Sequence, residues 1–259
     1  MAAGELLLVV VRDHGGPQPP VGRLGEEQLF FWSAGSGAYM SFAGLDMEAS
    51  SGPVTLEVEA VGGDGAPVEL RQDALVAPQT FPEQRLQVSQ NFVTPRSDDE
   101  SRAQRDHARL QELYARRTPA RFFSGRFQEP LRGRISADFG ERRVFNGIPK
   151  SPHGGLDIAA GLGRRVRAPA GGLVALADDL FYSGLTVILD HGYGLFSFYG
   201  HLSQLKVSAG AVVERGQVIG LVGATGRATG PHLHWSVRFG PARVDPHSLT
   251  ALDLSAWAP

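Results

Sequence analysis

Short runs of apolar and β-branched residues, separated by clusters of glycine, proline and serine, dominate the first part of the chain. The stretch Thr55–Val61 alternates apolar and polar side chains with the period of two that is typical of a half-buried strand. Similar runs and the turn-forming clusters between them predict a small β-sandwich or barrel over residues 1–87. The strands that we expect there are Leu6–Val11, Leu29–Trp32, Tyr39–Phe42 and Val54–Val61.

A helical pattern replaces this alternation in the next segment. Residues with apolar character recur at helical spacing over Ala103–Tyr114, and a proline follows where such a helix would end. Ser97, with Glu100 three residues later, matches a capping box in which Ser97 would be the N-cap residue. We therefore expect one helix over about 98–117, within a helical connector of residues 88–120.

From residue 121 onward the chain returns to short strand-like runs between glycine-rich turns, which favours an antiparallel sheet over βαβ units. The predicted fold class is mainly β, with an N-terminal β domain (1–87), the connector (88–120) and a C-terminal antiparallel β-sheet domain (121–259). The strands expected in the last part are Leu173–Ala177, Leu185–Asp190, Leu195–Tyr199, Val218–Val222 and His232–Phe239.

Composition and charge exclude several function classes. Apolar residues make up 42% of the chain, which is enough to bury a core. The formal net charge of -2 provides no overall positive field, so we expect no nucleic-acid partner. The chain has no cysteine, which excludes a disulfide scaffold, a thiolate zinc site and a cysteine nucleophile.

The early apolar run Leu6–Val11 is too short to span a membrane, which needs about 20 residues. No cationic segment precedes this run, so it does not have the pattern of a signal peptide. The sequence by itself leaves open a cytosolic protein and an exported protein whose signal lies outside it.

Histidines form the candidate chemistry, because five of the eight lie between positions 153 and 234. In an extended segment, His153 and Asp157 project to the same side, and so do His232 and His234. His201 follows a predicted strand end. Each of these patterns alone is more often structural, but together they indicate a metal site, and imidazole with carboxylate suits zinc. A zinc hydrolase needs three protein ligands and leaves one position for water, whose pKa falls to about 7.

The same residues belong to a larger pattern that resembles the lysostaphin-type (LytM-like) zinc metallopeptidases, which cut peptidoglycan peptides. The resemblance covers roughly 121–250, and the first 118 residues resemble, more loosely, the β domain and connector of some exported bacterial members. The segments that carry the resemblance are Phe139–Gly147, His153–Ala159, Gly192–Gly194, Tyr199–Ser203, Val213–Gly220 and Gly223–His234.

The resemblance implies one zinc ion per chain, with His153, Asp157 and His234 as its ligands. It also implies that His201 and His232 are catalytic. One of them would act as general base and the other would stabilise the oxyanion, and the sequence leaves open which does which. His191, in a predicted hairpin turn, is expected to be structural.

Two further expectations concern the loop before the first ligand. Asn146 and Arg142 lie there and would line the substrate groove. Several family members have a tyrosine about six residues before the first ligand, thought to assist the oxyanion, whereas this chain has Gly147. Either another group takes that part, or zinc and the two histidines suffice.

The function implied by the resemblance is a zinc-dependent endopeptidase that hydrolyses peptide cross-links of bacterial peptidoglycan with a metal-activated water. The extra N-terminal domain resembles Gram-negative envelope members, which favours D,D-endopeptidase action over cleavage of a glycyl bond. The partners would then be peptidoglycan peptide stems, and the location would be periplasmic or extracellular.

Alternative functions remain. A catalytically silent regulator, or a wall-binding protein of the same fold, would be expected to lack ligands, but here all five residues are present. Glu214–Gly220 also resembles a lipoyl-carrier hairpin, although neither Lys150 nor Lys206 lies in such a turn. The N-terminal domain has no chemistry of its own, which motivates the hypothesis that it occludes the groove and keeps the enzyme latent.

Overall fold

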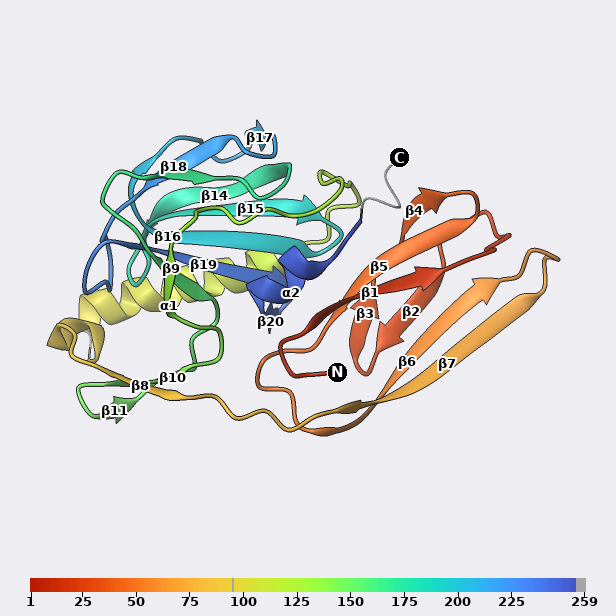
Figure 1. Ribbon diagram of the computed structural model, residues 1–259, viewed down its shortest axis with the longest axis horizontal. Coiled ribbons are helices and arrows are strands. Elements are labelled where there is room, and N and C mark those ends of the chain that lie inside the picture. The colour runs from red at the N-terminus through yellow and green to blue at the C-terminus, as the bar shows by residue number, and fades with distance from the viewer. Residues whose placement is uncertain (95, 255–259) are drawn as a thin grey trace.

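The computed structural model describes residues 1–94 and 96–254, and the mainly β fold class is confirmed (Figure 1). Strands of the N-terminal part form two small sheets, with orders β1-β5-β4 and β3-β2-β6-β7. The strand bounds in this part are β1 (Leu6–Val11), β2 (Val21–Leu24), β3 (Glu27–Leu29), β4 (Trp32–Gly35), β5 (Ala38–Gly44), β6 (Gly52–Val61), β7 (Pro67–Val76) and β8 (Glu83–Leu86).

The expected strand Leu29–Trp32 is wrong, because the chain crosses from one sheet to the other within it. Strand β3 ends at Leu29 in the larger of these sheets, and β4 begins at Trp32 in the smaller one. Phe31, between them, is buried. A continuously apolar run therefore marks burial here, and hydropathy carries no signal for the crossing.

Helix α1 (Ser97–Tyr114), preceded by the 3-10 turn η1 (Gln90–Phe92), begins one residue earlier than the capping box predicts. Arg96 is the N-cap residue, and its carbonyl accepts the first helical bond from the Glu100 amide at 2.8 Å. Ser97 is thus already helical. The helix ends at Tyr114, and Arg117 folds back to donate to the Tyr114 carbonyl at 2.8 Å, which satisfies an acceptor at the helix end.

Apart from β10 and β11, the strands of the C-terminal part form one antiparallel sheet, ten-stranded within the described chain, with the main order β17-β14-β15-β16-β19-β12-β9. The predicted strands of this part all fall within observed ones. The bounds are β9 (Arg134–Ala137), β10 (Arg142–Phe145), β11 (Ile148–Pro149), β12 (Leu156–Ala159), β13 (Arg165–Arg167), β14 (Gly172–Leu180), β15 (Gly184–Gly192), β16 (Leu195–Leu205), β17 (Val212–Val213), β18 (Val218–Val222), β19 (His232–Phe239) and β20 (Ala242–Val244), followed by helix α2 (Pro246–Ala251).

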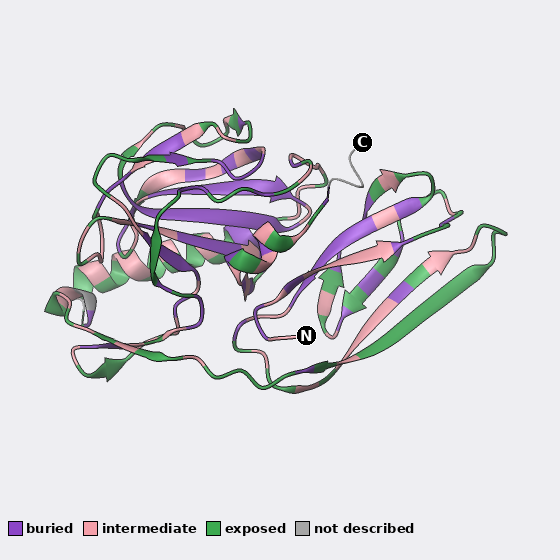
Figure 2. Ribbon diagram, in the orientation of Figure 1, coloured by how far each residue is buried: buried purple, intermediate pink, exposed green. Residues whose placement is uncertain are grey.

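Burial is deepest along the central strands of this sheet. Figure 2 shows β15 and β16 almost wholly buried, whereas β7 at the far edge of the N-terminal part is mostly exposed. Tyr199 and Trp235, register partners on β16 and β19, are both about fully buried. The candidate site therefore lies on strands that belong to the most deeply buried part of the large sheet.

The N-terminal sheets share a core with the C-terminal part. The rings of Trp32 and Phe123 meet edge to face with centroids 5.4 Å apart. A second contact joins the same two parts, because Arg243 Nε donates to Asp46 Oδ2 at 2.9 Å. The division into domains at residues 87 and 120 stays a prediction, and these contacts join the parts on either side of it.

A fourth sheet, small and three-stranded, forms beside the candidate site. Strand β8, which precedes α1, pairs in parallel with β10, and β10 pairs with β11. Residues 83–86 therefore lie alongside 142–145, although nearly sixty residues separate them in the chain. We call the β10–β11 hairpin with β8 the flap. It holds in place the loop that precedes His153.

Candidate metal centre

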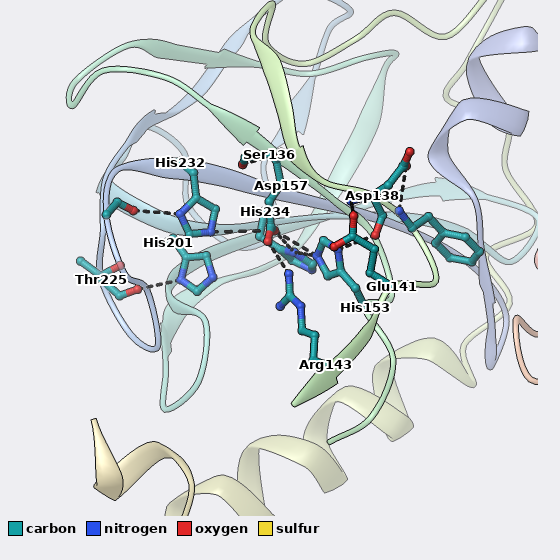
Figure 3. Close-up of polar contacts among 12 residues, drawn as sticks. Ser136, Asp138, Glu141, Arg143, His153, Asp157, His201, Thr225, His232 and His234 are labelled. Carbon is teal, nitrogen blue, oxygen red and sulfur yellow. Dashed lines mark hydrogen bonds and ion pairs between the residues drawn. The ribbon is translucent and has the colours of Figure 1, made fainter. Parts of the chain in front are cut away.

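Three side chains converge at one face of the β12–β19 pair (Figure 3). Asp157 on β12 and His234 on β19 are direct register partners, so their side chains leave the same face of the sheet. His153 lies in the loop four residues before Asp157. The distances between donor atoms are 2.8 Å from Asp157 Oδ1 to His234 Nδ1, 3.0 Å to His153 Nε2, and 2.9 Å between the two imidazole nitrogens.

This triangle of two imidazoles and one carboxylate fits a zinc ion. A tetrahedral zinc with ligand bonds of about 2.0–2.1 Å separates its ligand atoms by about 3.3 Å, so a small outward shift accommodates the ion. His153 Nδ1 lies 2.9 Å from the Asp138 carbonyl and donates to it, which leaves the Nε2 lone pair facing the other two groups.

The protonation states of these groups are those that a metal requires. Burial alone would raise the pKa of Asp157, but its close contacts with His153 and His234 outweigh burial and hold that pKa well below the usual range. Burial lowers the pKa of His234 to about 4. At neutral pH the site therefore presents an ionised carboxylate beside a neutral imidazole.

His201 and His232 lie next to this cluster, with their ring centroids 4.7 Å apart. His201 Nδ1 is 2.8 Å from the Thr225 carbonyl, and His232 Nδ1 is 2.8 Å from the Gly230 carbonyl. Because a carbonyl can only accept, both Nδ1 atoms carry the proton and both Nε2 atoms are free to accept one. His232 Nε2 is 3.8 Å from Asp157 Oδ1.

The backbone at His201 is unusual, with a φ of +60° that side chains other than glycine rarely adopt. The register between β15 and β16 shifts just before this residue, and the His201 amide donates to the Ser183 carbonyl at 2.7 Å. Such strain is maintained by surrounding structure and concentrates at functional sites. Burial, with the nearby histidines, lowers the pKa of His201 to about 3, so its imidazole is neutral.

Arg143 is a site residue that the sequence analysis missed. Its Nη2 donates to Asp157 Oδ2, the carboxylate oxygen that does not face the two histidines. Its side chain is 16% exposed, and its buried Nε has no hydrogen-bond partner among the described residues. Arg143 thus holds Asp157 with one oxygen directed at the imidazoles, as outer partners of metal ligands do.

Arg142 and Asn146 were expected to line the substrate groove, but their observed contacts lie elsewhere. Strand alternation turns Arg142 away from Arg143, and it is exposed. Asn146 uses its side-chain amide to bind both the amide and the carbonyl of Val88, at 3.0 and 2.9 Å. Asn146 therefore ties the flap to the chain before α1. A substrate role for these two residues stays a prediction that these contacts do not favour.

His191 lies within β15 and not in a turn, and it is fully buried. One ring nitrogen is 2.7 Å from the Gly171 carbonyl and the other 2.7 Å from Ser197 Oγ. Burial lowers its pKa to about 4. These contacts are those of a neutral histidine that holds strands together.

A groove of about 780 Å³ leads to the metal cluster between α1 and the large sheet. Tyr114 of α1 lines it on one side, with Tyr182 and Phe198 from the sheet side and His234 at the site. A mostly apolar cleft with a few convergent polar groups is a typical ligand site.

Known proteins resemble the chain in this region and beyond it. A family model described as "Peptidase family M23" matches residues 151–246. The chain is 39% identical over 113 residues to the peptidoglycan DD-endopeptidase ShyA of Vibrio cholerae, covering 43% of this chain and 26% of that protein. It is 39% identical over 132 residues to the DD-carboxypeptidase/endopeptidase Mpg of Neisseria meningitidis, covering 48% and 30%.

The solved structure of a Pseudomonas aeruginosa protein assigned to peptidase M23 covers 97% of this chain and 96% of its own, with 31% identity and a TM-score of 0.75. That similarity extends over the N-terminal part as well as the large sheet. The chain spans only about a quarter to a third of the two curated relatives.

Proposed function

Because the chain belongs to peptidase family M23, we propose that it is a zinc-dependent endopeptidase that hydrolyses peptide cross-links of bacterial peptidoglycan. The observation that carries the proposal is the convergence of His153, Asp157 and His234 beside two further histidines whose Nε2 atoms are free to accept a proton. The names of the relatives support the substrate class, and D,D-endopeptidase action is the form that we favour.

In the proposed reaction, His153, Asp157 and His234 hold zinc, and Arg143 keeps Asp157 oriented toward it. Zinc held by these residues would supply Lewis-acid polarisation of the scissile carbonyl and a bound water with a pKa of about 7. An Nε2 of His201 or His232 accepts a proton from the attacking water, and the proton is later passed to the amine that leaves. Stabilising the oxyanion requires an N–H donor, so the other histidine would act there with a proton on its Nε2, together with zinc.

Digestion of purified peptidoglycan by the zinc-loaded protein tests this function. We expect cross-linked muropeptides to disappear and uncross-linked ones to accumulate, with mass spectrometry identifying the bond. A chelator should stop the reaction, and added zinc should restore it, since the attacking water depends on the metal for its activation. Binding to peptidoglycan with no new products, at full zinc content, would instead establish the catalytically silent regulator or wall-binding protein.

The proposed location is periplasmic or extracellular, because peptidoglycan lies outside the cytoplasmic membrane. In residues 1–94 and 96–254, the structure contains no helix long and apolar enough to cross a membrane.

We also propose that the chain preceding the large sheet restricts access to the groove. Helix α1 forms one wall of the groove and is tied to β14 by two ion pairs, Arg102–Asp179 at 3.0 Å and Arg109–Asp178 at 2.6 Å. Both pairs are exposed, so each contributes on the order of 0.5 kcal/mol.

Loosening these pairs tests the restriction. The double variant Arg102→Ala/Arg109→Ala is expected to cut peptidoglycan about fivefold faster, because about 1 kcal/mol less holds α1 in place. Arg126→Ala, which removes a similar exposed pair with Asp253, is the matched control. Equal rates for all three proteins would refute the restriction and leave the proposed activity intact.

A further inference from the structure

Arg227 lies in the loop between β18 and β19 and bridges three segments around the site. Its guanidinium carbon is 4.8 Å from the ring centroid of Phe145 on the flap and 4.5 Å from that of Tyr182, between β14 and β15. Its own amide donates to the Tyr182 carbonyl at 2.7 Å. The guanidinium is thus held between two aromatic rings.

The charge of Arg227 is not balanced by any acid among the described residues. No ion pair or side-chain hydrogen bond joins it to a carboxylate there. Burial, together with the nearby positive charge of Arg143, lowers its pKa to about 10, so it remains a cation at neutral pH. Two aromatic rings offset only part of the cost of a partly buried charge. An anion from a ligand would complete the site.

The position of Arg227 relative to the reaction follows from its neighbours. Thr225, two residues earlier, holds His201 through its carbonyl. Phe145, which the guanidinium covers, shares one face of β10 with Arg143, the partner of Asp157. Arg227 is therefore connected through Thr225 and Phe145 to the segments that hold His201 and Arg143, and it lies near enough to Arg143 for the two charges to interact. Tyr182, its other ring, also lines the groove that leads to His234.

We propose that Arg227 binds a free carboxylate adjacent to the scissile amide of the substrate, and that this contact directs the enzyme to D,D cross-links. In such a cross-link the leaving amine is attached to a carbon that also carries a free carboxylate. In a glycine bridge the corresponding carboxyl group is consumed in the next amide, so it offers no charge. Planar guanidinium recognises carboxylate with paired hydrogen bonds. This inference rests on the proposed function.

Two cross-linked dimers that differ only at this carboxyl group test the inference, one with a carboxylate and one with a carboxamide. Wild-type protein is expected to show a kcat/KM about 10- to 100-fold higher for the carboxylate dimer, the range of one charged hydrogen-bonding contact. Arg227→Gln should lose that preference, mainly because its kcat/KM for the carboxylate dimer falls. Arg227→Lys should keep part of the preference. Arg164→Gln, which removes an exposed arginine from the turn just before β13, should keep it fully.

Binding of the same dimers to the metal-free protein, measured by calorimetry, separates this inference from the proposed function. If zinc-loaded wild-type protein cleaves neither dimer, the proposed activity is refuted. The inference about Arg227 is still supported in that case if the metal-free wild type binds the carboxylate dimer with a lower Kd than the carboxamide dimer and Arg227→Gln does not. Equal affinity of the wild type for both dimers would overturn the inference. The inference would also be overturned if a folded Arg227→Gln protein lost affinity equally for the carboxylate and the carboxamide dimer.

Discussion

Replacing His153 or Asp157 by alanine is expected to reduce bound zinc from about one per chain to near zero and turnover to background. Each residue supplies one of three donor atoms that lie within 3.0 Å of one another. Two remaining ligands cannot satisfy a tetrahedral ion that must also keep a position for water. Metal analysis after dialysis, together with peptidoglycan digestion, measures both effects.

Asp157→Ala also leaves Arg143 without its carboxylate, so loss of zinc must be separated from loss of fold. Asp157→Asn keeps the size of the side chain and still removes the charge that zinc needs. His247→Ala is the control, because His247 is an exposed histidine of the same part of the chain. Full zinc content in a folded Asp157→Asn protein would mean that Asp157 is not a ligand.

Replacing His201 is expected to leave zinc in place while lowering kcat by about 10²–10⁴-fold, the usual contribution of a positioned acid–base group. His201 contributes no atom to the donor triangle, and its free Nε2 is the property that the reaction uses. Zinc content and single-turnover rates on a soluble cross-linked dimer measure the two quantities separately.

The choice of substitute matters at this position because the backbone has a φ of +60°. Alanine there adds strain, whereas asparagine tolerates the left-handed region. His201→Asn therefore separates the loss of the imidazole from backbone strain. Turnover within tenfold of wild type, at equal zinc content, would remove His201 from the mechanism and leave the proton transfer to His232.

The strands that carry the site could be predicted from local pattern because their side chains alternate against a buried sheet. His232–Phe239 was predicted with the bounds that β19 has. The spacings of His153 with Asp157 and of His232 with His234 are likewise local, since residues two or four apart in extended chain project to one side. Their convergence on one point depends on the pairing of Asp157 with His234 across two strands.

The local sequence pattern could not predict which of two neighbouring residues faces the site, or where one element ends and the next begins. Arg142 and Arg143 are equivalent in sequence, and a strand turns only one of them toward Asp157. The predicted strand Leu29–Trp32 failed for a related reason, because apolar character reports burial but not which sheet a residue joins. Ser97 was misplaced at the helix start by one residue, which is a usual uncertainty at helix ends.

The residue types and short spacings of this chain determined by themselves a mainly β protein with a histidine and aspartate metal site, because alternation and coordination chemistry act over a few residues. Tertiary structure alone decided that β8 joins the flap, that Arg143 orients Asp157, and that Arg227 is held between rings from two distant segments. These contacts bring together residues tens of positions apart. Such pairings depend on the packing of the whole chain and leave no periodic signal in it.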